Sequence, residues 1–141
     1  SNIENPNEPK KVSPSFEDVE RIYSKEDNIG WGEGLWGFIH SSAVVYVPEK
    51  REWYITLFKR SLPYLLPKSE YYVEAIRAIP LEKYLGSNFD LFFWTYAVHD
   101  HINLRASMAD PKLQRKLSRP FEEIRSYYFR GLAEECKTCQ I

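Results

Sequence analysis

Apolar residues recur every three to four positions along most of the chain, which is the period of an α-helix. The first such series is Leu35, Phe38, Ile39, Ala43 and Tyr46. Proline lacks an amide proton and clashes with the preceding helical turn, so we expect this helix to end at Pro48.

Four further segments show the same helical period. They are a segment with Tyr54, Leu57, Phe58 and Leu62 that Pro63 and Pro67 stop or kink, a short helix from about residue 69 to residue 78, the apolar segment Phe89–Ile102, and an amphipathic helix with Phe121, Ile124, Tyr128 and Leu132 that ends near Cys136. A turn and cap at Gly86-Ser87-Asn88 and a break at Asp110-Pro111 border the apolar segment. Five helices with short connections predict an all-α fold, a small helical bundle.

The chain divides into three parts. Residues 1–14 contain almost no apolar side chain, so we expect a flexible N-terminal arm. Residues 15–135 form a single helical domain, and residues 136–141 form a short tail with the motif C-x-x-C. The two cysteines of this tail permit at most one disulfide, which excludes a scaffold held together by several disulfides.

Composition narrows the range of partners. The 19 basic and 20 acidic residues nearly balance, which argues against nucleic-acid binding. The longest stretch without Asp, Glu, Lys or Arg runs from Gly34 to Pro48 and is too short for a spanning helix, so we expect no membrane insertion. Aromatic residues make up 16% of the chain and either fill a core or hold a flat ligand.

Two motifs combine aromatic rings with polar side chains. The first is W-G-x-x-x-W-x-x-x-H, with Trp31, Gly32, Trp36 and His40. Trp36 and His40 are four residues apart and so share one helix face. A core tryptophan beside a satisfied histidine would give the same pattern.

The second motif ends the most apolar segment. It reads W-x-x-x-x-H-x-x-x-N-x-R, with Trp94, His99, Asn103 and Arg105. His99 and Asn103 share a face, and a guanidinium group suits a pyrophosphate. A ligand with a flat ring and phosphates would satisfy these polar groups, whereas a helix end that reaches solvent would need no ligand.

Together the two motifs resemble those of the Erv/ALR family of FAD-linked sulfhydryl oxidases, over roughly residues 31–128. The resemblance implies a four-helix bundle plus a short fifth helix, FAD as cofactor and a homodimer. It also implies that FAD is contacted by residues of both motifs: Trp31, Gly32, Trp36, His40, Trp94, His99, Asn103 and Arg105. Asp100 replaces an asparagine of the family motif and loses an amide donor.

The redox centre departs from this family. Family members carry C-x-x-C at the start of the third helix, but the matching segment, from Ser61 to Tyr71, contains no cysteine. Cys136 and Cys139 are therefore the only cysteines that could form a catalytic pair. This pair could reach the flavin directly, bind a metal with His99 or His101, or be incidental or structural; we expect no metal site because a closed zinc site needs four ligands.

Two hypotheses about function follow from the resemblance. The chain is a divergent FAD-linked thiol oxidase, which passes electrons from a dithiol, such as that of a protein substrate, through flavin to oxygen or another acceptor. Alternatively, it is an FAD-binding or flavin-free pseudo-oxidase that serves as a binding or dimerisation module. A third possibility, independent of FAD, is that the aromatic helices bind a protein partner.

Overall fold

Helices make up the regular structure. The computed structural model describes residues 15, 17–18, 31–66, 69–109 and 118–135 of the 141. The helices named here are α2 (Trp31–Val44), η1 (Pro48–Lys50), α3 (Arg51–Ile55), η2 (Thr56–Ser61), α4 (Leu62–Leu65), α5 (Glu70–Ala78), η3 (Leu81–Tyr84), α6 (Asn88–Ala109) and α7 (Phe121–Glu135). No strand occurs in these ranges, so the predicted all-α class is confirmed for the described part of the chain. None of the helices there is long and apolar enough to cross a bilayer.

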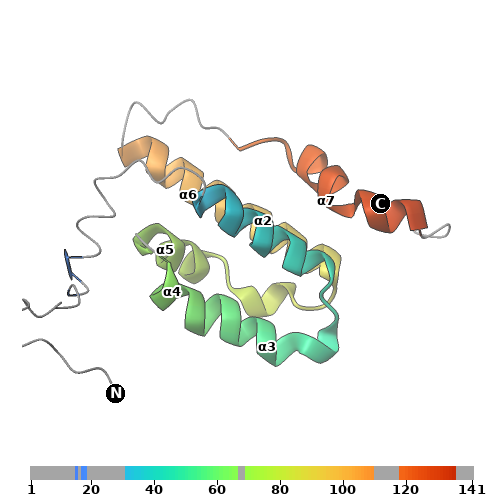
Figure 1. Cartoon of the computed structure of the whole chain (residues 1–141), viewed down its shortest axis with the longest axis horizontal. Coiled ribbons are helices and arrows are strands. Elements are labelled where there is room, and N and C mark those ends of the chain that lie inside the picture. Colours follow the sequence, from blue (N-terminus) through green and yellow to red (C-terminus); the bar gives the residue numbers. More distant parts are fainter. Residues whose placement is uncertain (1–14, 16, 19–30, 67–68, 110–117, 136–141) are drawn as a thin grey trace, which may run out of the picture.

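Helix α6 lies at the centre of the arrangement. It packs against α2 on one side and against α5 and η3 on another, while α7 packs against α2. Figure 1 shows α2 running along α6, with α3, α4 and α5 on one side of this pair and α7 on the other. Trp36 stacks on His99 and His40 pairs with Thr95, so α2 and α6 are antiparallel. The predicted arm (residues 1–14) and tail (residues 136–141) lie outside the described residues.

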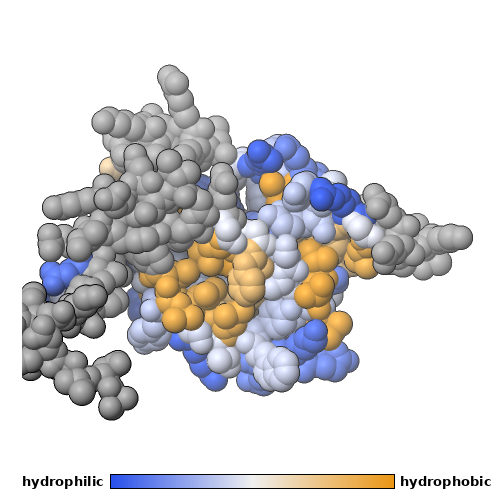
Figure 2. Space-filling view, in the orientation of Figure 1, coloured by the Kyte–Doolittle hydropathy of each residue, from blue (hydrophilic) through white to orange (hydrophobic). Residues whose placement is uncertain are grey.

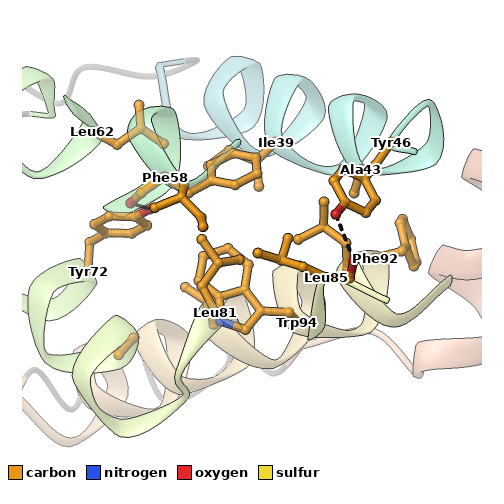
Figure 3. Close-up of a cluster of buried hydrophobic side chains, with 14 of the residues drawn as sticks. Ile39, Ala43, Tyr46, Phe58, Leu62, Tyr72, Leu81, Leu85, Phe92 and Trp94 are labelled. Carbon is orange, nitrogen blue, oxygen red and sulfur yellow. Dashed lines mark hydrogen bonds between the residues drawn. The ribbon is translucent and has the colours of Figure 1, made fainter. Parts of the chain in front are cut away.

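Large aromatic side chains fill the core. Phe58 and Phe92 are fully buried, and Trp94 is nearly so. Figure 3 shows these rings between the helices, together with Tyr46 and Tyr72. The Tyr46 hydroxyl donates to the Leu85 carbonyl at 2.7 Å, and the Tyr72 hydroxyl donates to the Phe58 carbonyl. Their polar ends are therefore satisfied, so burying these rings gains the hydrophobic contribution without an unpaired donor.

Helix α2 ends earlier than the sequence pattern predicts. It stops at Val44, and Pro48 begins the short helix η1 instead of ending α2. Val47 is extended, with φ −132° and ψ 151°, because the ring of a following proline disfavours the helical region. Proline is well suited to the first turn of a helix, where its missing amide proton is not needed.

The helix neither stops nor kinks at Pro63, because a π-helical turn comes before the proline. The helical backbone continues from α3 through η2 into α4 and reaches Leu65, but η2 is a π-helix. Within it the Leu62 amide donates to the Leu57 carbonyl, five residues back. The wider turn comes just before Pro63, which cannot donate a helical hydrogen bond, so the chain keeps its direction through the proline.

Helix α6 is longer than the predicted apolar segment. Its start is capped as expected, since the Ser87 hydroxyl oxygen accepts from the Asp90 amide at 3.2 Å. The helix continues to Ala109, and the predicted break at Asp110-Pro111 lies outside the described residues. The polar residues from His99 to Arg105 therefore lie inside the helix rather than at its end.

Candidate functional site

Four of the predicted site residues meet between α2 and α6. The Trp36 and His99 rings are stacked, with centroids 4.0 Å apart and planes at 6°. His40 lies one turn along α2, with its ring 5.6 Å from that of His99. Together with Asn103 they line a cleft of about 350 Å³. We call this cleft the first pocket; its wall is completed by Gly37, Tyr96, Ser118, Arg119, Ile124 and Tyr128.

Helical spacing explains how these side chains converge. Trp36 and His40 are four residues apart on α2, and His99 and Asn103 are four apart on α6, so each pair projects from one face. The Tyr96 hydroxyl donates to the Arg119 carbonyl at 2.6 Å. This hydrogen bond fixes the backbone of the segment before α7 against α6, and so places Arg119 at the pocket.

His40 is buried and neutral. Burial, reinforced by the neighbouring His99, lowers its pKa from 6.5 to about 3. The Thr95 hydroxyl donates to the Phe92 carbonyl at 2.7 Å, so its oxygen accepts from His40 Nδ1 at 2.9 Å. A neutral imidazole has one donor and one acceptor nitrogen, and this bond leaves Nε2 as the acceptor. His40 can therefore accept a hydrogen bond from a ring N–H or an amine.

His99 is also neutral near pH 7. Burial lowers its pKa from 6.5 to about 4, although the neighbouring Asp100 acts in the opposite direction. The side-chain amide of Asn103 donates to the Ser118 hydroxyl at 3.0 Å. Among the described residues that line the first pocket, Arg119 is the only charged side chain, and its ion pair with Glu123 is long, at 3.9 Å. The arrangement suits a flat ring that carries an anionic group at one end.

Arg105 lies elsewhere. Its Nε is 3.0 Å from Oε1 of Glu74 on α5, and its guanidinium lies 5.9 Å from the centre of the Tyr71 ring. Nε2 of His101, which is buried and has no hydrogen-bond partner among the described residues, lies 3.5 Å from the same carboxylate. Arg105 therefore ties α6 to the first turns of α5, and it does not line the first pocket.

Trp94 is also separate from the four converging residues. It is 1% exposed, and its indole N–H donates to the Ile79 carbonyl at 2.8 Å. Trp31 and Gly32 are in the first turn of α2, and their side chains lie outside the described part of the structure. Cys136 and Cys139 are also outside the described residues, so their relation to the pocket stays a prediction.

Several residues of the first pocket do not belong to the two motifs. Tyr96 lies three residues before His99, so its helical spacing could have identified it. Tyr128 belongs to the apolar face predicted for the last helix. The spacing of apolar residues does not distinguish a residue that lines a pocket from one that packs in the core. Ser118 and Arg119 carried no signal because they belong to no periodic segment.

No known family, curated protein or solved structure matches this chain. Among the residues that the structure describes, no three His, Cys, Asp or Glu side chains form a group that could hold a metal ion. A proposal about the function of this protein therefore depends on the geometry of the first pocket.

Proposed function

We propose that the first pocket binds the cofactor FAD and that the protein is a divergent FAD-linked sulfhydryl oxidase of the Erv/ALR type. The observation that carries this proposal is the convergence of Trp36, His40, His99 and Asn103, from two helices, around one cleft. These are four of the eight residues for which the resemblance implies FAD contacts. Their convergence is what FAD binding requires.

The chemistry of the pocket fits part of FAD. Aromatic faces can stack on a planar ring, His40 Nε2 can accept a hydrogen bond from it, and Arg119 and Ser118 can contact phosphate oxygens. Since Arg105 is held by Glu74, we assign the phosphate contact to Arg119 instead. The cleft of about 350 Å³ accommodates one ring system rather than a whole dinucleotide, so the rest of FAD extends beyond it.

FAD, when bound, accepts two electrons from a dithiol and passes them to oxygen or another acceptor. The protein must supply a dithiol relay, and Cys136 and Cys139 are the only cysteines in the sequence. We propose that this pair loses two electrons and two protons to become a disulfide, which a thiol-containing substrate protein then reduces by exchange.

The second candidate is an FAD-binding pseudo-oxidase without thiol oxidase activity, acting as a binding or dimerisation module. It is favoured by the segment from Ser61 to Tyr71, which matches the position of the cysteine pair in an oxidase of this type and contains no cysteine. The Tyr71 ring at the end of this segment lies beside the Arg105 guanidinium, and the Glu74 carboxylate binds the same guanidinium. An ion pair and a phenol cannot exchange with a disulfide.

We also propose that the helices adopt the Erv/ALR arrangement, a four-helix bundle with an additional helix, and that the protein forms a homodimer. Apolar residues reach the surface in the middle of the face shown in Figure 2. Phe38 on α2 and Val45, directly after α2, are 53% and 60% exposed, which suits burial against a second copy. Light scattering coupled to gel filtration tests this, and a mass of one chain would contradict it.

Absorption spectroscopy tests the flavin proposal. We expect the purified protein, or the protein incubated with FAD and desalted, to retain a flavin band in the visible range. A Trp36→Ala, Asn103→Ala double variant should lose it, while an Arg60→Gln variant, changed at an exposed residue away from the pocket, should keep it. Absence of the band from the unchanged protein after incubation would refute both FAD proposals.

Oxygen consumption separates the two candidates. With dithiothreitol as the electron donor, a thiol oxidase consumes oxygen, and a Cys136→Ser, Cys139→Ser variant loses this activity while retaining the flavin band. Flavin binding with no oxygen uptake supports the pseudo-oxidase. Equal rates in the variant and the unchanged protein would exclude the cysteine pair as the redox centre.

A further inference from the structure

A larger hollow lies on the other side of α6. It has a volume of about 550 Å³ and shares no lining residue with the first pocket. We call it the second pocket. Its walls come from η2, α4, α5, η3 and α6, so it lies between segments that are far apart in the sequence. The volume is in the range typical of small-molecule sites.

The floor of the second pocket is apolar. Leu81 is 2% exposed and Trp94 is 1% exposed, and both appear among the core side chains of Figure 3. The indole N–H of Trp94 is already donated to the Ile79 carbonyl, so the ring offers only apolar surface to the cavity. Val73 and Ile76 of α5 extend this surface. A hydrocarbon or aromatic body fits here.

The rim is aromatic and rigid on one side. Tyr64, on α4, is 86% exposed although its ring lines the cavity, and Pro63 precedes it. Lys59 of η2 and the α4 residues Pro63 and Tyr64, four and five positions further along, all line the cavity. An exposed tyrosine over an apolar floor gives a flat ligand a second face to pack against.

Some charged side chains of the second pocket form an ion pair and one does not. Lys59 Nζ is 2.5 Å from Glu82 Oε1, so these two side chains neutralise each other. Arg77, an exposed residue at the end of α5, also lines the pocket, and no ion pair or hydrogen bond joins it to any residue that the structure describes. Within the described part of the pocket wall, one unpaired positive charge therefore remains beside an apolar floor, and the guanidinium can bind an anionic group through two parallel hydrogen bonds.

From this arrangement we infer that the second pocket is a binding site for a small aromatic carboxylate. The flat body packs on the partly exposed Val73 and Ile76, above the buried Leu81 and Trp94, and under Tyr64, and the carboxylate binds the Arg77 guanidinium. A carboxylate fits better than a phosphate monoester, because the single unpaired charge balances one negative charge and a second one would lie near Glu82. This site is independent of FAD binding in the first pocket.

Titration calorimetry with matched probes tests the inference on the full-length chain. We expect indole-3-acetate to bind. Indole-3-acetamide, which has the same shape but no charge, should bind with an affinity at least about tenfold lower. Phenyl phosphate should also bind more weakly. Equal affinity for the acetate and the amide, or no heat with the acetate at about 5 mM, would overturn the inference.

Variants locate the site. Arg77→Gln should weaken indole-3-acetate binding about tenfold, while Arg77→Lys, which keeps the charge, should recover part of the loss. Arg60→Gln makes the same charge change on η2 at a residue that does not line the pocket, and it should leave the affinity within about twofold. A loss in Arg60→Gln equal to that in Arg77→Gln would show a diffuse charge effect and overturn the site.

Competition separates the two pockets. Saturating FAD should leave the affinity for indole-3-acetate unchanged, and Asn103→Ala should leave it unchanged as well, because Asn103 lines only the first pocket. Displacement of indole-3-acetate by FAD would place the probe in the first pocket and overturn the inference. If FAD does not bind at all, the proposed function fails while the calorimetry of the second pocket still decides this one.

Discussion

Two histidines, the buried His40 and the partly buried His99, make the stability of this protein depend on pH. Burial lowers the pKa of His40 to about 3 and that of His99 to about 4, from 6.5 in each case. The unfolded chain takes up these two protons first as the pH decreases. The free energy of unfolding is therefore highest above pH 6.5 and falls below it, until the folded-state pKa values are passed.

The size of the effect follows from the shifts. Each histidine that stays neutral in the folded state lowers the free energy of unfolding by about 1.4 kcal/mol for each pH unit below its unfolded pKa. Between pH 6.5 and about pH 5 this amounts to about 2 kcal/mol for His40 and a similar amount for His99. The total, about 4 kcal/mol, is a large part of the stability of a typical domain, about 5–15 kcal/mol.

Urea unfolding followed by tryptophan fluorescence measures this loss. We expect the free energy of unfolding to fall by about 4 kcal/mol from about pH 7 to about pH 5 in the unchanged protein. In His40→Gln the fall should be about half as large, since only His99 still titrates. His101→Gln is the matched control, because it leaves both of the other histidines in place.

Either of two results would refute the reasoning. One is an unfolding free energy that stays constant between these pH values in the unchanged protein. The other is a His40→Gln variant that loses as much stability as the unchanged protein. Both would mean that His40 is not buried in its neutral form.

Three substitutions test the placement of single side chains. Asn103→Ala should lower FAD affinity about tenfold in a flavin-fluorescence titration, because the amide faces the first pocket. Arg105→Gln should leave that affinity within about twofold and lower the free energy of urea unfolding by less than about 1 kcal/mol, because its partner is the half-exposed Glu74; a tenfold loss of FAD affinity would contradict this placement. Phe129→Ala should lower the free energy of urea unfolding by about 3–5 kcal/mol, because the ring is fully buried against Phe89 and Phe92; a loss below about 1 kcal/mol would show that α7 is not anchored there.

The helical segments could be predicted because apolar spacing reflects which side of a helix is buried. Of the apolar face predicted for the last helix, Phe121, Ile124 and Tyr128 lie on α7 and pack against the core, whereas Leu132 is 38% exposed. The helix ends were harder to predict. Pro63 reads as a break, yet a π-helical turn accommodates it, and the choice between these depends on packing around Phe58 that no local pattern encodes.

The site residues divide according to helical phase. His99 and Asn103 are one turn apart and reach the same pocket, whereas Arg105 is six residues after His99 and so projects from another side of α6. The prediction for Arg105 depended on resemblance, not on phase, and the structure places it with Glu74. Arg119 could not be predicted, because only tertiary packing brings the segment before α7 against α6.

The stack of Trp36 on His99 has a consequence for ligand entry. With ring centroids 4.0 Å apart, the two rings leave no room for a third ring between them. A flat ligand must therefore either pack on the outer face of the pair or separate it, and separation exchanges one stacking contact for two. In the second case, the measured affinity is the intrinsic affinity reduced by the fraction of molecules in which the pair is open. In that second case the Trp36 indole competes with the ligand for the face of His99, and Trp36→Leu would speed association even where it weakens the final complex.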